Sequence, residues 1–126
     1  MIRARNIDLS TLKVNLYNNT SGSTGKITLS ESAANFEYLE IYYKTNDNEC
    51  GFAKVYNPNG KDLILSGCVG NSSSLAAWIK TRVVHIDGTS ITTVSSRYVE
   101  CRSMSNGNTL SGSNYIYITR VDGWKI

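Results

Sequence analysis

The sequence predicts an all-β protein: an antiparallel, jelly-roll-like β-sandwich of about eight strands with at most one short helical turn. Apolar and polar residues alternate along several short segments, which is the period of a strand with one buried face. Turns rich in Asn, Gly, Ser and Asp separate these segments. The composition agrees, because only 18% of the residues are charged and the Ala, Glu, Lys and Leu of helical bundles do not dominate.

The length of 126 residues predicts one domain, which we place at residues 10–126 after an N-terminal arm at 1–9. The elements expected in the first part are a strand at 13–17, a polar loop at 18–25, a short strand at 26–29, one helical turn within 30–35 and a strand at 37–44.

The strand at 37–44 alternates most clearly. Its faces are an aliphatic one at Leu39, Ile41 and Tyr43, and an aromatic, charged one at Tyr38, Glu40, Tyr42 and Lys44. We expect the aliphatic face to fill the core and the other to be partly exposed. The closing segment YIYITRV repeats the pattern of YLEIYYK, which suits two neighbouring strands.

The second part of the chain follows the same pattern. The expected elements are a hairpin of strands 52–56 and 62–65 around the turn NPNG, a loop at 66–74, a strand at 78–86, the turn DGTS at 87–90, a strand at 91–102, a polar loop at 106–114 and a strand at 115–121. In the strand at 78–86 one face carries Trp78, Lys80, Arg82, Val84 and Ile86.

The charge pattern excludes some functions. The net charge of +3 comes from scattered Lys and Arg, with no block longer than Lys80 to Arg82. Proteins that bind nucleic acid usually carry a clustered basic stripe, so we expect no such partner. No apolar run reaches the roughly 18 residues of a transmembrane helix, and the first ten residues lack the apolar core of a secretory signal. We therefore expect no membrane insertion.

The cysteines and the oxygen-rich segment give little indication of a disulfide or a metal site. Cys50, Cys68 and Cys101 are an odd number at wide spacings, so we expect free thiols in a protein assembled in a reducing cytoplasm. One disulfide with a spare thiol is the alternative for a chain that ends outside cells. The oxygen-rich NDNE at 46–49 lacks the Gly and Glu of a calcium loop, which favours a polar turn. We expect no metal and no cofactor.

Catalytic residues are not indicated either. His85 has Asp87 two residues on, but no serine stands in a nucleophile elbow. Glu40 and Glu100 could form a glycosidase-like carboxylate pair, yet cationic neighbours favour ion pairing across strands. We expect a non-enzymatic protein.

Among the residues of the chain, the tyrosines, Trp78 and Trp124 best indicate a function. Three interpretations stay open. They pack the fold, since aromatic residues favour strands. They form a subunit interface, or they form a platform on which sugars stack.

Four blocks together resemble a known family: LSESAANFEYLEIYYKTND at 29–47, KVYNPNGK at 54–61, IKTRVVHIDGTSITTVSSRYVE at 79–100 and IYITRVDGWK at 116–125. They are similar to a domain near the carboxyl end of tail-fibre or baseplate receptor-binding proteins, in phages and prophages of Gram-positive gut bacteria. The resemblance covers roughly residues 10–126, and it carries over no catalytic residues.

The resemblance implies a non-enzymatic virion part that is assembled in the bacterial cytoplasm, attaches to the host surface or supports the virion, and forms a homotrimer. Its implied partners are other tail proteins and a host cell-wall saccharide. We then expect Tyr38, Tyr42, Tyr115 and Tyr117 at the subunit interface, and the ligand at the loops 18–25, 66–74 or 104–114. The alternative is a carbohydrate-binding module of a secreted or surface glycan-degrading system.

Overall fold

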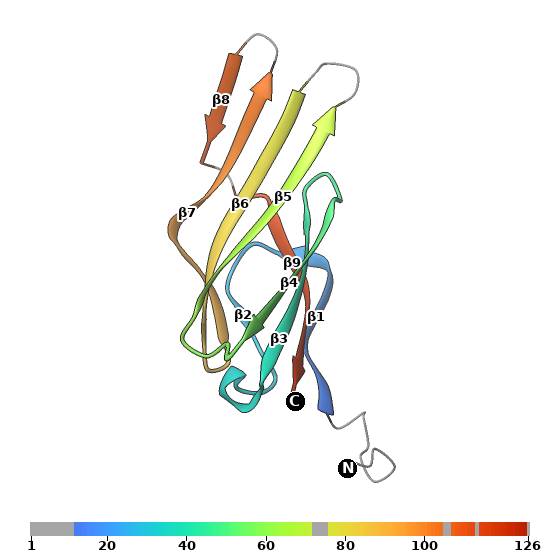
Figure 1. Ribbon diagram of the computed structural model, residues 1–126, viewed down its shortest axis with the longest axis vertical. Helices are drawn as coiled ribbons and strands as arrows, with labels where there is room; N and C mark the ends of the chain where they lie inside the picture. Colours follow the sequence, from blue (N-terminus) through green and yellow to red (C-terminus); the bar gives the residue numbers. More distant parts are fainter. Residues whose placement is uncertain (1–11, 72–75, 105–106, 113, 126) are drawn as a thin grey trace, which may run out of the picture.

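Nine strands lie in two antiparallel sheets in the computed structural model, which describes residues 12–71, 76–104, 107–112 and 114–125. The strands are β1 (Lys13–Ser23), β2 (Ile27–Thr28), β3 (Tyr38–Thr45), β4 (Cys50–Tyr56), β5 (Asp62–Asn71), β6 (Ala76–Asp87), β7 (Ser90–Met104), β8 (Gly107–Ser111) and β9 (Ile116–Trp124). Sheet A has the order β1-β9-β3-β4, and sheet B has the order β2-β7-β6-β5 with β8 paired to β7. The two sheets pack face to face (Figure 1), which confirms the predicted sandwich.

A single turn of 3-10 helix at Ala33–Asn35 precedes β3. It begins at Ser32, whose Oγ accepts a hydrogen bond from the backbone N–H of Ala34 at 3.2 Å. The helical turn predicted within 30–35 is therefore confirmed. The N-terminal arm predicted at 1–9 lies outside the described residues, as do 72–75, 105–106 and 113.

Sheet A is organised around β3, which pairs with β9 on one side and β4 on the other. The pairing of β3 with β9 confirms that the two similar tyrosine-rich segments are neighbours. Leu39, Ile41 and Tyr43 point into the sandwich and are buried, so the predicted assignment of the two faces of β3 is correct.

One core lies between the sheets. Its buried apolar side chains are Leu16, Ile27, Leu29, Ala33, Phe36, Leu39, Ile41, Tyr43, Val55, Leu65, Val84, Ile86, Ile91, Ile116, Ile118 and Val121. Burial of this apolar surface is the main force that holds the two sheets together. The same inner surface also contains two cations from β6, Lys80 and Arg82, which are fully buried.

Sheet B is longer than sheet A. The upper parts of β5, β6, β7 and β8 continue past the end of sheet A (Figure 1), and they pair with one another throughout. The predicted loops are wrong here, because β5 continues to Asn71 and β8 occupies Gly107–Ser111. The loop predicted at 18–25 is also wrong, since β1 runs to Ser23. Backbone groups pair whatever the side chains are, so segments rich in Ser, Thr, Asn and Gly also form strands. Such strands lack the apolar alternation by which a strand is predicted from sequence.

The turn NPNG joins the two sheets and does not close a hairpin. β4 pairs with β3 and β5 pairs with β6, so the predicted hairpin of 52–56 with 62–65 is wrong. The turn bonds to both sheets: Asn57 N–H donates to Glu37 O at 2.9 Å, and Gly60 N–H donates to Ile86 O at 2.7 Å. Both residues have positive φ, which Asn and Gly tolerate best. The residue types therefore indicate the turn, while the long-range bonds decide where it leads.

Candidate functional site

Five aromatic side chains gather on the outer surface of sheet A, and we call the part of the surface that they form the aromatic face. They are Tyr38, Tyr42, Phe52, Tyr56 and Trp124. Trp124 and Tyr56 lie opposite Tyr38 on its two sides, with ring centroids 5.8 and 5.3 Å from that of Tyr38. Phe52 lies opposite Tyr42 at 5.1 Å. Phe52 and Tyr56 are 51% and 52% exposed, so the aromatic face is open to solvent.

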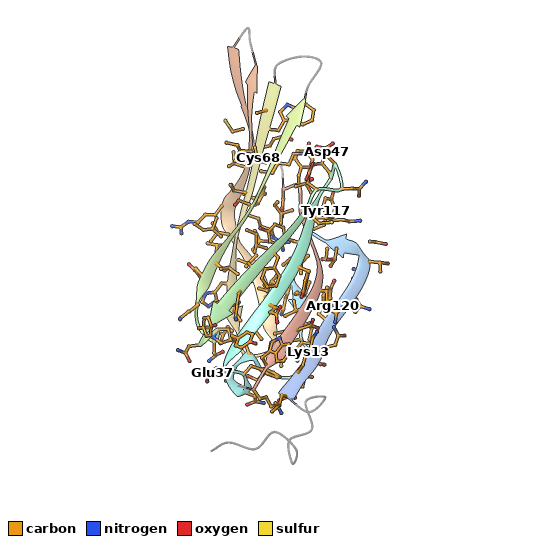
Figure 2. All side chains as sticks on the ribbon, turned by 45° about the vertical axis from the view of Figure 1, so that its right-hand side comes forward. Lys13, Glu37, Asp47, Cys68, Tyr117 and Arg120 are labelled. Atoms are coloured by element: carbon orange, nitrogen blue, oxygen red, sulfur yellow. The ribbon has the colours of Figure 1, made fainter. Side chains whose placement is uncertain are left out.

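A row of polar groups crosses the aromatic face between the two rows of rings. Asp122, Glu40 and Lys54 stand opposite one another on β9, β3 and β4. Asp122 is fully buried: Arg120 Nε lies 2.9 Å from its Oδ2, and Asn15 Nδ2 donates to its Oδ1 at 3.0 Å. Two carboxylates facing each other repel, so the flanking cations are what hold this row together. Figure 2 shows Arg120 and Lys13, a second cation 3.6 Å from Asp122, along sheet A.

Tyr42 connects the polar row to the rings. Its hydroxyl donates a hydrogen bond to Glu40 Oε2 at 3.2 Å. Burial, and then the negative charge of Glu40, raise the pKa of Tyr42 above its ordinary value. The hydroxyl is therefore protonated at neutral pH, and it holds the Glu40 carboxylate in a defined position.

An arch in β1 forms one border of the aromatic face. Asn18 lies opposite Arg120 and Ser23 lies opposite Ile118, so β1 uses five residue steps where β9 uses two. The surplus chain folds over β9 onto Tyr117. Gly22 has a φ of +81°, and a Cβ added there would lie 2.5 Å from Cβ of Tyr117, so this close approach requires glycine.

A groove of about 340 Å³ lies between the arch and β4. It is lined by Thr20, Tyr42, Tyr43, Lys44, Cys50, Gly51 and Thr119. A polar pocket of about 170 Å³ adjoins it, lined by Ser21, Lys44, Thr45, Asn46, Asn48 and Tyr117. Lys44 borders both, and its Nζ donates to Thr20 O at 3.3 Å. The groove extends the aromatic face with a concave surface.

Gly51→Ala is expected to lower the free energy of unfolding by about 1–3 kcal/mol. The added Cβ would lie 2.2 Å from the ring of Tyr43, which the bond from its hydroxyl to Ser66 O at 2.9 Å holds in place. Urea denaturation measures the change. Gly112→Ala is the control, because its Cβ would meet nothing within 4 Å. Equal losses in the two variants would contradict the packing of Tyr43 beneath Gly51.

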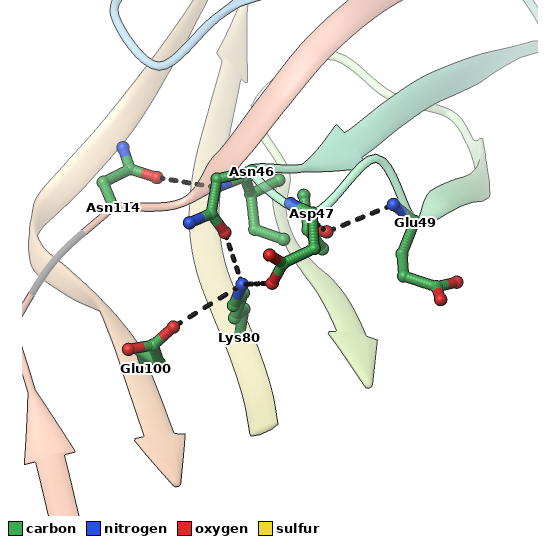
Figure 3. A network of polar contacts seen from close by, with 8 residues as sticks. Asn46, Asp47, Glu49, Lys80, Glu100 and Asn114 are labelled. Carbon is green, nitrogen blue, oxygen red and sulfur yellow. Dashed lines mark hydrogen bonds and ion pairs between the residues drawn. The ribbon is translucent and has the colours of Figure 1, made fainter. Parts of the chain in front are cut away.

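The turn that joins β3 to β4 is held by a lysine from the other sheet (Figure 3). Lys80 Nζ donates to Asn46 Oδ1 and to the Asp47 carboxylate, and lies 3.5 Å from Glu100 Oε2. We call Lys80, Asn46, Asp47 and Glu100 the Lys80 cluster. The segment NDNE is thus a polar turn whose side chains bond to the other sheet, and it positions one wall of the polar pocket.

Three of the four tyrosines expected at a subunit interface share one side of the molecule. Tyr38, Tyr42 and Tyr117 lie on the outer surface of sheet A. Tyr115 lies apart from them, with its ring centroid 5.3 Å from Lys80 Nζ. The four do not form one surface, and the interface itself stays a prediction. Of the regions expected to bind ligand, 18–25 contributes Thr20 and Ser21 to the groove and pocket, while 66–71 and 107–111 are strands of sheet B.

The catalytic pairings considered from the sequence are not formed. His85 Nδ1 lies 2.7 Å from Asp62 Oδ1 across the strand pair, so its partner is not Asp87. Glu40 lies on the outer surface of sheet A and Glu100 is buried beside Lys80, so these two carboxylates do not face each other.

All three cysteines are free thiols. Cys68 and Cys101 both lie opposite Ile79, one on each side. That places them two strands apart, about 10 Å, which is beyond the reach of a disulfide within one chain. Within the described parts of the chain, no three metal-binding side chains gather, and no helix is long and apolar enough to cross a membrane.

No protein-family model and no curated protein matches the chain, so the site is interpreted from its own geometry. Sequence reasoning did not single out Phe52, Tyr56 and Asp122 as parts of this face. A signal for the first two was present, because Phe52, Lys54 and Tyr56 alternate with Ala53 and Val55. No signal identified Asp122, since its burial depends on side chains from β1 and β9 that cover it.

Proposed function

We propose that the chain is a non-enzymatic attachment domain of a bacteriophage tail, and that its aromatic face binds a saccharide of the host cell wall. The observation that carries this proposal is that Glu40 and Lys54 lie between two rows of aromatic rings, of which Phe52 and Tyr56 are exposed. The sequence resemblance to tail-fibre and baseplate domains supports the phage setting.

The chemistry of the aromatic face suits a sugar. A sugar ring has apolar C–H surfaces that pack on aromatic rings, and hydroxyls that bond to carboxylates, amides and amines. Phe52 and Tyr56 offer exposed rings. Glu40 and Lys54 lie between them and offer an acceptor and a donor. The groove beside Tyr42 gives a chain of several sugars a concave path across the sheet.

Lysine side chains cover part of the rings in the free protein. Lys54 Nζ lies 4.1 Å from the centroid of Tyr38 and 5.0 Å from that of Tyr56. Lys54 is exposed, and a cation–π contact at an exposed site is worth only about 0.5–1 kcal/mol. A sugar can therefore displace the Lys54 ammonium from the rings and bond to it at the edge of the site.

The carboxylates support binding more than hydrolysis. Asp122 is fully buried and held by Arg120 and Asn15, so its oxygens are not open to solvent for the activation of an attacking water. Glu40 is held by the hydroxyl of Tyr42 and faces Lys54. Glu40 and Asp122 are neighbours on one surface of the sheet and Asp122 is buried, so the two cannot stand on opposite sides of a glycosidic bond, which glycoside hydrolysis needs.

Phe52→Ala is expected to weaken binding to purified cell walls of Gram-positive bacteria at least about tenfold, because one of the two exposed rings of the aromatic face is lost. Sedimentation of protein with wall fragments measures the affinity. Ile64→Ala is the matched control: Ile64 is 66% exposed but lies on sheet B, so binding should be unchanged. Equal affinities of the two variants would contradict the proposal.

The thiol of Cys50 gives a second readout on the unaltered protein. Cys50 lines the groove, whereas Cys68 lies on sheet B (Figure 2). Bound saccharide should slow the alkylation of Cys50 and leave that of Cys68 unchanged at the same protein concentration. Binding to cellulose or starch but not to bacterial walls would favour the alternative of a module from a glycan-degrading system.

A further inference from the structure

The outer surface of sheet B differs in chemistry from the aromatic face. Eight of its positions across β5, β6 and β7 carry no carboxylate, amine, guanidinium or imidazole, and we call them the uncharged face: Ile64, Ser66, Cys68, Ile79, Thr81, Val83, Val99 and Cys101. Cross-strand pairing makes them contiguous, with Cys68, Ile79 and Cys101 in one row and Ser66, Thr81 and Val99 in the next.

The uncharged face is exposed. Ile64 and Ile79 are 66% and 51% exposed, although β-branched aliphatic residues are usually buried. Charged groups begin only at its borders, with the exposed Arg97 and the His85–Asp62 pair. It also reaches β5, the edge strand of sheet B. Soluble proteins normally protect such edges and surfaces with charges, so an uncharged, apolar one indicates a surface that is covered in the assembled protein.

We propose that a second copy of this chain covers the uncharged face, and that the two copies pack sheet B against sheet B with two-fold symmetry. A surface without charges meets its own copy without like-charge repulsion, which is what a self-complementary two-fold contact requires. Face-to-face packing of sheets is also an ordinary arrangement, with side chains of the two surfaces interdigitating.

The available area agrees with a dimer. β6 has 12 residues and so spans about 40 Å, and β5, β6 and β7, the strands of the uncharged face, span about 14 Å. Their outer surface has a projected area of about 560 Å² with the uncharged face at its centre, so a contact that extends to the borders of this surface approaches the roughly 800 Å² that each partner buries in a standard interface. The contact leaves the aromatic face free on the opposite side of the sandwich. It differs from the trimer through tyrosines that the sequence resemblance implies, and it does not depend on the proposed saccharide binding.

Light scattering on Ile79→Asp tests the proposal. The unaltered chain should have twice its 13.9 kDa mass, and Ile79→Asp should return it to 13.9 kDa, because two carboxylates would be buried in the contact. Phe52→Asp is the matched control, since Phe52 is as exposed as Ile79 but lies on the aromatic face. This control should stay dimeric. Circular dichroism confirms that both variants fold.

The native thiols report on the same contact without substitution. As the protein concentration rises, alkylation of Cys68 and Cys101 should slow, while that of Cys50 on sheet A should not change. A mass of 13.9 kDa at about 1 mM would overturn the proposal, and so would a mass of three chains. A dimer that Phe52→Asp disrupts and Ile79→Asp does not would place the contact on the aromatic face, and would equally overturn it.

Discussion

Arg82→Met is expected to lower the free energy of unfolding by about 3–5 kcal/mol, a large share of the roughly 5–15 kcal/mol of a typical domain. Arg82 is fully buried between the sheets. Its guanidinium donates to the backbone oxygens of Ser23, Ile116 and Gly25 at 2.9, 3.0 and 2.9 Å, and to Thr93 Oγ1 at 2.9 Å. Methionine fills similar space but leaves these acceptors without a donor.

All four of these bonds go to neutral oxygens. Burial lowers the pKa of Arg82 to about 10, which still leaves it charged at neutral pH. Because an isolated buried charge is unfavourable, the charge depends on these four acceptors. Arg82 therefore joins the end of β1, the segment before β2, the start of β9 and strand β7. Loss of the guanidinium should loosen the arch of β1 as well as the core.

Thermal unfolding followed by circular dichroism measures the effect, with an expected fall in Tm of about 10–20 °C. The Tm of Arg82→Lys should lie between those of the unaltered protein and of Arg82→Met, because a single ammonium cannot reach all four oxygens. Arg97→Met is the control for loss of a charge, since Arg97 is exposed. If Arg82→Met changed stability no more than Arg97→Met, the guanidinium would not be the group that joins these strands.

The alternation of apolar residues predicted the parts of the fold where one side of a strand is buried. β3 and β6 are examples: Leu39 and Ile41 face inward, and so do Val84 and Ile86. Burial depends on side-chain polarity, so a pattern of polarity contains this information. A pattern of polarity does not show which distant strands pair with each other. The turn NPNG was correctly predicted as a turn, but its residues do not specify that the chain crosses from sheet A to sheet B.

The extension of sheet B shows a second limit of sequence reasoning. In its strands, small polar residues and glycines replace the apolar alternation, because sheet A does not cover that part of sheet B. Strands form there through backbone hydrogen bonds to neighbouring strands, and the local amino-acid composition does not predict these bonds.

The candidate site was partly predictable for the same reasons. Tyr38, Glu40 and Tyr42 were placed on the outer surface of their strand, and the structure agrees. Their neighbours Asp122 and Trp124 lie more than 75 residues further along the chain, so the composition of the face depends on register. Lys80 and Arg82 were correctly grouped on one face of their strand with Val84 and Ile86, but their partners come from other strands and from loops.

Lys80→Met is expected to lower the free energy of unfolding by about 3 kcal/mol, because it removes the ammonium that faces the buried carboxylate of Glu100. The double variant Lys80→Met/Glu100→Gln should recover at least about 1 kcal/mol of the loss, since the amide keeps hydrogen-bonding capacity without a charge. Urea denaturation of the single and double variants forms the cycle. Lys26→Met is the control at an exposed lysine, with an expected change below about 0.5 kcal/mol.

The Lys80 cluster also connects stability to the candidate site. Asn46 lines the polar pocket and is held there by Lys80, a residue of the other sheet. Lys80→Met should therefore weaken binding of cell-wall fragments even at temperatures where the protein is fully folded, because the turn at 46–49 loses its inter-sheet bonds. Glu100→Gln alone keeps the bonds of Lys80 to Asn46 and Asp47, so it should preserve binding. Equal binding by folded Lys80→Met and Glu100→Gln would show that the turn holds its position without Lys80, and that the cluster contributes to stability alone.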